Sequence, residues 1–517
     1  MMGLLNGWLL PACYMTGFAL ACLLPRQHWT VARITAGLGL ASTLVAASAA
    51  GLAAGLADRQ VDKPGLTVAL LIALLGWVIV RYSARYLEGE AQQPRFVKAL
   101  LFTLACVSLL VVSQHLVLLV LGWSCTSLGL HYLLTFYRER RTAQVVAHKK
   151  FIVSRLADLS LLAALVLIYQ AAGTLSLRGL SDYLAHLDAL PAGLHWAAGL
   201  FALAAILKSA QLPLHGWLIQ VMEAPTPVSA LLHAGVVNVG GFVLIRLAEL
   251  LALAPASQML LVLVGSLTAV LASLVMMTRI SIKVRLAWST CAQMGFMLVE
   301  VGLGLYELAL LHLVAHSFYK AHAFLAAGET VSETRALALL GTQGARRSLV
   351  RYLLSPVVSG MLVAGSLAGW QWLLPAAGLT LPTAAALVLA LGLAPLLWLE
   401  QGRSAALVAH AGLRVLLLIQ LYFVWHWLFA GLAPAASGTA PWLMAWVCVA
   451  FVLLYGLQIW LRRHPQGRLA QRLYPWAYCG FYLDETFTRL TFALWPARLG
   501  KLQPTMRPDT TPLGETV

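Results

Sequence analysis

The chain has little charge for its length. Charged residues make up 10% of its 517 positions, and only 19 of them are acidic. Hydrophobic residues supply 61% of the chain, and the mean hydropathy of +0.82 is well above that of soluble proteins. Apolar runs of about 20 residues, the length that crosses a hydrocarbon core, recur along the whole sequence and leave no room for a soluble domain between them. The sequence therefore predicts an all-α polytopic membrane protein.

Motifs for phosphate, dinucleotide or metal binding are missing as well. We find no phosphate-binding glycine loop, no dinucleotide fingerprint and no HExxH motif. The 7 cysteines include no CxxC pair, and most lie in apolar runs, so we expect small core residues rather than metal ligands or disulfides. We therefore expect no cofactor in this chain. Its predicted role is to move something across a membrane and not to act as an enzyme.

The net charge of +16 does not indicate a nucleic-acid partner. The Lys and Arg residues lie in short loops, and every second loop is basic, which is the positive-inside bias of membrane proteins. One loop, Glu223 to Pro227, is short and acidic and breaks this trend. The bias predicts a multi-pass membrane protein, in contact with membrane lipids, with its N-terminus outside and its C-terminus in the cytoplasm.

We count about fifteen apolar segments long enough to be transmembrane helices. They are 4–24, 32–56, 65–86, 97–113, 115–137, 148–170, 193–221, 227–251, 256–278, 284–302, 306–330, 352–374, 381–400, 412–432 and 441–461. The predicted parts of the chain are N-terminal helices (1–96), two five-span units (97–251 and 256–400), C-terminal helices (401–461) and a tail (462–517). An odd number of spans in each unit inverts the second unit relative to the first, as in many transporters.

Lys208 is the most informative residue of the sequence. It lies inside the apolar run from Phe201 to Gln220, and a charge at the bilayer centre costs about 2.5–3.5 kcal/mol, so such a residue usually faces a water-filled path. Pro213 removes a backbone donor and is expected to break the helix beside the lysine, and Pro225 and Pro227 extend the irregular stretch. A broken helix with an ionisable group is typical of ion-translocating proteins.

A second set of ionisable groups is spaced i, i+4, i+8. His312, His316 and Lys320 share one face of a predicted helix, each about 6 Å above the last. Neutral imidazole can accept a proton on one nitrogen and release one from the other, so a row of imidazoles leading to an amine suits a proton relay. The alternative is that the histidines only hydrogen-bond to neighbouring helices. We favour the relay, because three aligned groups would otherwise carry three separate burial costs.

Four further residues are candidates for the same path. Asp158 lies one turn from Arg155, so these two could simply neutralise each other, or Asp158 could take part in translocation. His215 and Glu223 flank the broken helix, and His233 follows it within the next apolar run. Each is as compatible with a structural role as with a place in the path.

The tail differs in character from the apolar segments. Residues 468–499 mix aromatic and charged side chains and are too polar to span. One interpretation is a helix lying at the membrane surface. The other is a docking segment for a soluble partner at the cytoplasmic face, with Tyr482, Asp484 and Glu485 as its contacts.

Three segments resemble the antiporter-like subunits of respiratory complex I and of multisubunit cation/proton antiporters. They are Lys149–Leu175, Lys208–Gly235 and Ser289–Gly328. The resemblance implies an antiporter-like fold with two inverted five-helix repeats and a broken helix. It also implies that Lys208 and Lys320 carry protons.

The chain departs from that family at two positions. The family has a glutamate after Gly-Trp on its fifth helix, paired with the broken-helix lysine, but here Ser124 follows Trp123. A second broken-helix lysine is also missing, since no lysine lies between Lys320 and Lys501. Water beside Ser124, or Asp158 or Glu223, would then have to balance Lys208. We expect one continuous path, from Lys208 to Lys320, His316 and His312.

These losses, together with the tail sequence GFYLDETFTRL, resemble the DabB family, the membrane subunits of two-component inorganic carbon accumulation complexes. The resemblance implies a large DabA-like partner, similar to β-carbonic anhydrases, that holds the zinc and forms bicarbonate from CO2 while ions flow through the membrane subunit. The alternatives are a proton-pumping subunit of a complex I-type NADH-quinone oxidoreductase and a subunit of a multisubunit Na⁺/H⁺ antiporter. The missing carboxylate and lysine count against both. The coupling ion, H⁺ or Na⁺, stays open, although the histidines favour protons.

Overall fold

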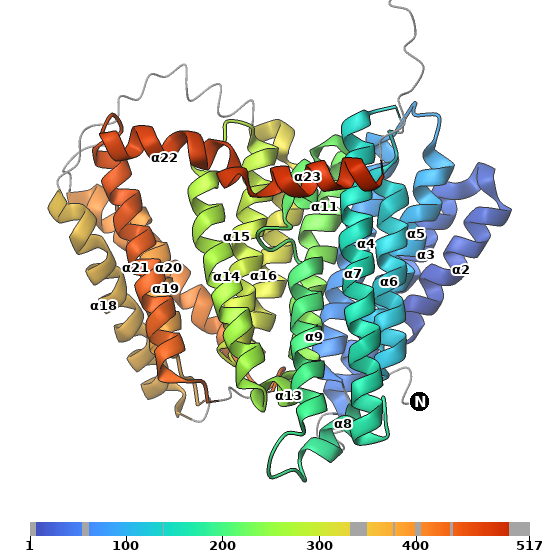
Figure 1. The fold of residues 1–517 in the computed structure, drawn as a ribbon, viewed down its shortest axis with the longest axis horizontal. Coiled ribbons are helices and arrows are strands. Elements are labelled where there is room, and N and C mark those ends of the chain that lie inside the picture. The colour runs from blue at the N-terminus through green and yellow to red at the C-terminus, as the bar shows by residue number, and fades with distance from the viewer. Residues whose placement is uncertain are drawn as a thin grey trace, which may run out of the picture.

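The computed structural model consists of helices joined by short connections. It describes residues 7–53, 62–137, 139–330, 349–375, 378–398, 405–434 and 438–495. Within these ranges the regular elements are all helical, as the composition predicts, and the single β-bridge is an isolated one. Figure 1 shows most of the long helices running side by side between two ends of the molecule.

The chain builds three groups of helices in order. The first is α2 (Leu9–Leu23), α3 (His28–Ala53), α4 (Lys63–Tyr86), α5 (Gln93–Val112), α6 (Leu116–Leu134) and α7 (Arg141–Ala172). The second is α8 (Leu177–Leu184), α9 (Ala192–Lys208), α10 (Gly216–Ile219), η3 (Gln220–Glu223), α11 (Thr226–Ala234), η4 (Val236–Asn238), α12 (Val239–Arg246), α13 (Ala248–Ala252), α14 (Pro255–Met276), α15 (Ile282–Gly302) and α16 (Tyr306–Leu325). The third is α18 (Leu349–Leu373), α19 (Thr383–Leu393), η6 (Ala394–Leu397), α20 (Ala405–Phe429), α21 (Pro441–Arg463), α22 (Arg468–Tyr478), η7 (Gly480–Tyr482) and α23 (Leu483–Leu494).

Prolines mark the start of several long helices. Pro64, Pro94, Pro255 and Pro441 each stand at the first or second position of α4, α5, α14 and α21. The missing N–H costs nothing there, because the first amides of a helix have no partner within it. Asp62 adds a cap to α4 by accepting a hydrogen bond from the Gly65 amide at 3.1 Å.

Each of the predicted apolar segments contains helix, but not every helix qualifies as a span alone. In the described part of the chain, 10 helices are long and apolar enough to cross a membrane. The apolar helices α2, α9 and α19 are shorter, and α15 and α16 carry too many polar side chains. The chain is thus a multi-pass membrane protein. The count of about fifteen crossings and the two inverted units at 97–251 and 256–400 stay predictions.

The largest buried core joins the first two groups of helices and reaches α20 and α21. In the segment from Thr226 to Arg246, which comprises α11, η4 and α12, 94% of the residues in the apolar stretch are buried. The corresponding value for Leu349–Leu373 (α18) is 22%. The broken segment therefore lies at the centre of the protein, whereas α18 belongs to its periphery.

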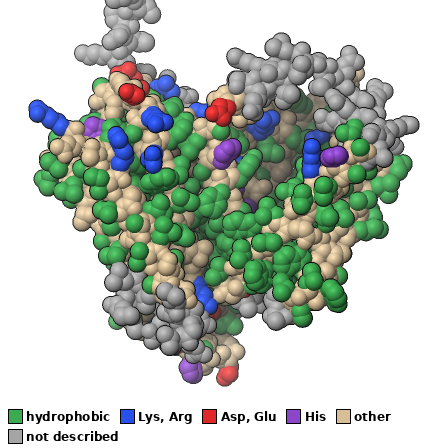
Figure 2. All heavy atoms as spheres, turned by 180° about the vertical axis from the view of Figure 1, so that it is seen from behind, with side chains coloured by type: hydrophobic (Ala, Val, Ile, Leu, Met, Phe, Trp, Pro, Cys, Tyr) green, Lys and Arg blue, Asp and Glu red, His purple; other side chains and the backbone are tan. Residues whose placement is uncertain are grey.

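The tail forms two helices, not the single surface helix that we expected. Figure 1 shows α22 and α23 lying across one end of the bundle, opposite the end that carries α8. Three successive residues with positive φ, Gly480, Phe481 and Tyr482, end α22 and turn the chain into α23. Figure 2, seen from behind, shows the visible Lys and Arg side chains gathered mostly near this same end, above a largely hydrophobic band.

Candidate functional site

The helix that leads to the centre of the bundle ends at Lys208. The last helical hydrogen bond of α9 runs from the Ser209 amide to Ala205, and no helix longer than one turn follows until Thr226. Pro213 lies within this irregular stretch, as expected from the sequence, and Pro225 is the residue before α11. Pro227 stands in the first turn of α11, where proline fits a regular helix, so it marks the end of the break.

Lys208 is buried against an acidic partner on α7. Its Nζ lies 2.6 Å from Oδ1 of Asp158 and 4.7 Å from the centre of the Trp123 ring. Ser124 Oγ donates a hydrogen bond to the same carboxylate oxygen at 2.8 Å. The structure thus answers the question of which group balances Lys208. Asp158 does so, and the Ser124 hydroxyl holds the same carboxylate from α6.

Asp158 also keeps the second partner that its spacing suggested. Arg155 Nη2 lies 2.7 Å from the other carboxylate oxygen, Oδ2. The two interpretations of Asp158, neutralisation of Arg155 and contact with the path, are therefore compatible, because each oxygen serves one cation. Removing one member of a buried ion pair costs about 3–5 kcal/mol, since it leaves an uncompensated charge.

The second lysine has a different environment. Lys320 is 1% exposed, and its Nζ donates to the Leu286 carbonyl at 3.1 Å and to the Ser289 hydroxyl. Both acceptors are neutral and lie on α15. Among the described residues, no carboxylate forms an ion pair with Lys320.

The row that was predicted on α16 continues to a residue that the sequence did not single out. The ring centres of His316 and His312 are 5.9 Å apart. His312 Nδ1 lies 2.7 Å from Oε2 of Glu300, a buried carboxylate on α15. Glu300 stands between Val299 and Val301 in an apolar run, the same signal that identified Lys208. That signal could have found it.

The other candidate histidines are both buried near the break. His233 on α11 stacks on Phe324 of α16, with ring centres 4.4 Å apart. His215 lies 4.8 Å from the ring of Trp288, and its Nδ1 is 3.2 Å from the Pro213 carbonyl. Glu223 ends η3, but its side chain lies outside the part of the chain that the structure describes.

Buried polar atoms connect the two lysine sites. Helix α12 packs against both α9 and α16, and Asn238 Nδ2 donates to Ser317 Oγ at 2.8 Å. Several buried atoms here have no hydrogen-bond partner within the described residues: Ser209 Oγ, Asn238 Oδ1 and both ring nitrogens of His233 and His316. Buried polar atoms are normally hydrogen-bonded, so a cluster of unpaired ones is unusual in a protein core. We call these atoms, which lie between Lys208 and Lys320, the polar track.

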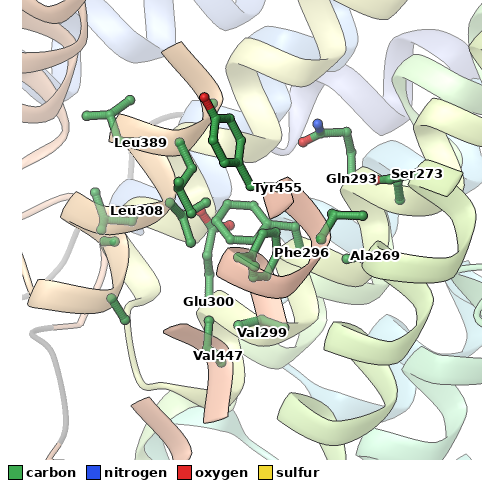
Figure 3. Close-up of a pocket in the computed structure, with 18 of the residues that line it drawn as sticks. Ala269, Ser273, Gln293, Phe296, Val299, Glu300, Leu308, Leu389, Val447 and Tyr455 are labelled. Atoms are coloured by element: carbon green, nitrogen blue, oxygen red, sulfur yellow. The ribbon is translucent and has the colours of Figure 1, made fainter. Parts of the chain in front are cut away.

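A cavity of about 470 Å³ adjoins the far end of this track. Figure 3 shows Glu300 among the residues that line it, together with Phe296, Gln293 and Tyr455. The remaining lining side chains are mostly apolar and come from α14, α15, α16, α19, α20 and α21. The Glu300–His312 pair is therefore placed beside a space between helices.

The predicted docking residues divide into two kinds. Tyr482 is 48% exposed, and the exposed Glu485 pairs with Arg489 on the same helix. Asp484 instead points into the protein, where its Oδ2 lies 2.7 Å from the Nζ of Lys149, a side chain with no exposed surface. Asp484 is thus engaged in a contact within the chain, and its part in partner docking stays a prediction. Lys149, at the start of the predicted segment 148–170, was not among the candidate residues of the sequence analysis.

A bundle of apolar helices with a buried lysine at a helix break is typical of ion-translocating membrane subunits, and the comparisons show which class this is. A profile of the family described as NADH:quinone oxidoreductase/Mrp antiporter, TM, matches residues 113–392. A chain of the solved Mrp complex from Dietzia sp. shares the fold with a TM-score of 0.62 at 24% identity, over 96% of this chain and 60% of that one.

Relatives in sequence show to which group of this family the chain belongs. The probable inorganic carbon transporter subunit DabB of Hydrogenovibrio crunogenus is 41% identical over 446 residues, which are 85% of this chain and 84% of that protein. NADH-quinone oxidoreductase subunit L of Mycobacterium tuberculosis is 37% identical over 276 residues, 53% of this chain and 43% of that protein. The chain belongs to the NADH:quinone oxidoreductase/Mrp antiporter family and, within it, to the DabB group of inorganic carbon transporter subunits.

Proposed function

We propose that this chain conducts protons through the bacterial inner membrane and so energises inorganic carbon uptake by a two-component complex. The observation that carries the proposal is the Lys208–Asp158 pair at the helix break, since the counter-charge lets a buried amine hold a proton inside the membrane. We propose inorganic carbon as the transported substrate because the Hydrogenovibrio crunogenus relative is named as a probable subunit of an inorganic carbon transporter. In this proposal the end with α22 and α23 is cytoplasmic, and the N-terminus is periplasmic.

The proposed route follows the polar track. A proton held at Lys208 passes across the break, by way of Ser209, Asn238 and bound water, to Lys320 and His316. Imidazole then transfers it along α16 to His312 and Glu300. Glu300 is the last ionisable group of the row, and the adjacent cavity is the proposed connection to the opposite side.

The proposed partner is a large DabA-like zinc subunit at the cytoplasmic face. The exposed side of α22 and α23, with Tyr482 and Glu485, is the proposed docking surface. The zinc and the hydration of CO2 belong to the partner in this proposal. Truncation after Arg463 is expected to release the partner from purified membranes while the spans still insert. Partner retained at normal stoichiometry would leave α22 and α23 only a surface-anchoring role.

A subunit of a complex I-type oxidoreductase or of an Na⁺/H⁺ antiporter is the alternative, and its support is the family match over 113–392. We prefer the proposal for carbon uptake for two reasons. The chain has Ser124 where the resemblance to these two groups predicts a glutamate, and it has no lysine between Lys320 and Lys501, where the resemblance predicts one.

Replacement of Lys208 tests the proposed function. Lys208→Ala is expected to abolish growth at ambient CO2 in cells that depend on the complex, while the complex remains assembled. Lys208→Arg is expected to fail too, because arginine does not release its proton at these pH values. Lys98→Ala, a half-buried lysine on α5, is the matched control. Wild-type growth with an assembled Lys208→Ala complex would contradict the proposal.

A further inference from the structure

The C-terminal helix α23 places a carboxylate against the broken helix. Asp484 Oδ2 lies 2.7 Å from Lys149 Nζ and accepts a hydrogen bond from Gln220 Nε2 at 3.3 Å. Lys149 Nζ in turn donates to Gln220 Oε1 at 3.2 Å. These three residues come from α23, α7 and η3 and close a triangle of contacts at the end of the bundle that carries α22 and α23.

The approach of Asp484 to the break is unusually close. A Cβ atom added to Gly216, the first residue of α10, would lie 1.7 Å from Oδ1 of Asp484. Only glycine leaves room for the carboxylate at that position. His215, the preceding residue, lies within electrostatic range of the same carboxylate.

One oxygen of Asp484 is left without a protein partner. Oδ1 is buried and forms no hydrogen bond to any described residue, although Oδ2 has three donors, on Lys149, Gln220 and Thr488. The side chain as a whole is 22% exposed, so it reaches the surface on one side and the break on the other. A carboxylate in this position can take up a proton from the aqueous side and present it to the interior.

Helix α7 carries the connection from this group to Lys208. Lys150 follows Lys149, is buried, and lies 5.4 Å from the ring of Trp217 on α10. It is within electrostatic range of both Lys208 and Asp158. Asp158 lies eight residues further along α7, which is about 12 Å of helix. Charged groups therefore line one helix from the surface to the break.

We propose that Asp484, although it is carried on the surface helix α23, is a member of the ion path and forms its cytoplasmic entrance with Lys149 and His215. This inference rests on the proposed function. It assigns to the C-terminal segment a part of the path itself. The simpler alternative is that the Lys149–Asp484 pair only fastens α23 to the bundle.

The first test is Asp484→Asn in the full complex. The amide keeps the size of the side chain and the contact to Gln220 but cannot take up a proton. We expect the partner to remain bound and ion-driven bicarbonate uptake to fall by more than about tenfold, as one lost proton-transfer group would produce. The matched control is Glu88→Gln, an exposed carboxylate on the loop after α4, with uptake expected to be unchanged. Wild-type uptake by Asp484→Asn would overturn the inference.

Two further variants distinguish a role of Asp484 in the ion path from a role in attaching α23 to the bundle. Gly216→Ala should displace the carboxylate and reduce uptake as Asp484→Asn does, whereas Gly193→Ala on α9, where an added Cβ meets no atom within 4 Å, should be neutral. The double variant Lys149→Met, Asp484→Leu replaces the ion pair by apolar side chains that can hold α23 in place. Restored uptake in this double variant would overturn the inference in favour of fastening alone, and continued loss with α23 docked supports the path.

The failure of this inference can be distinguished from failure of the proposed function. If Lys208→Ala abolishes uptake and Asp484→Asn does not, only the proposed entrance at Asp484 is contradicted. If neither variant changes uptake in an assembled complex, ion conduction through this chain is wrong as well.

Discussion

The two buried lysines of this protein are held in different ways. Lys208 contacts Asp158 at 2.6 Å, whereas Lys320 donates to the carbonyl of Leu286 and the hydroxyl of Ser289. An ion pair stabilises the protonated amine, but neutral acceptors do so much less, because they carry no opposing charge. In the proposed route, this difference makes Lys208 the group that would store a proton and Lys320 the group that would pass it on.

The two lysines also differ in their wider surroundings. Lys208 stands at a helix break, with Arg155 as a second cation on the same carboxylate. Lys320 lies in the unbroken helix α16, one turn from His316, whose two ring nitrogens have no partner among the described residues. The first site is built around charge, and the second is built around groups that can change their hydrogen bonds.

Loss of the shared carboxylate is expected to have the largest effect. Asp158→Asn leaves Lys208 and Arg155 without an anion at a cost of about 3–5 kcal/mol. We expect carbon-dependent growth to be lost and the thermal stability of the purified complex to fall. Asp182→Asn, an exposed acid on α8, is the control and should change neither property. An Asp158→Asn complex with normal uptake would mean that another group balances Lys208.

The next prediction tests whether Lys208 and Lys320 belong to one path. Lys320→Ala is expected to reduce uptake as much as Lys208→Ala, and the double variant is expected to be no worse than either, because one interruption blocks a single route. Uptake would be measured with bicarbonate accumulation in whole cells. Additive losses, or full activity of Lys320→Ala, would show that the two lysines serve separate routes.

A smaller effect is expected from the neutral acceptor of Lys320. Ser289→Ala removes one hydrogen bond to the amine but leaves the Leu286 carbonyl. A hydrogen bond to a charged group contributes about 1.5–3 kcal/mol, so we expect a partial reduction of the uptake rate and a complex that assembles normally. The comparison variant is Ser160→Ala on α7, where the hydroxyl donates to the Leu156 carbonyl of the same helix. Equal loss in both variants would argue against a specific role for Ser289.

The sequence pointed to the buried ionisable residues more readily than to the residues that they contact. Lys208 was found because one charge in an apolar run is costly, and His312, His316 and Lys320 were found because helical spacing is local. The pairing of Asp158 with Lys208 had to stay open, since it joins residues 50 positions apart. The contact between Lys149 and Asp484 joins residues 335 positions apart and was missed. No periodicity in the chain reports which helix will lie across the end of another.

The turn between α22 and α23 was missed for another reason. Gly480 is a local signal for the end of α22, but Phe481 and Tyr482 adopt φ values of 56° and 58°, which L-residues with bulky side chains rarely do. The packing of Phe481 against the cluster around Trp288 accompanies this turn.

The shared carboxylate at the break also determines what happens when a proton leaves. Asp158 presents one oxygen to Lys208 and the other to Arg155, and arginine remains charged throughout the physiological pH range. When Lys208 becomes neutral, the three side chains go from one net positive charge to none, and Asp158 still has a cation at 2.7 Å. The site can therefore be emptied and refilled without ever leaving a solitary anion in the membrane interior.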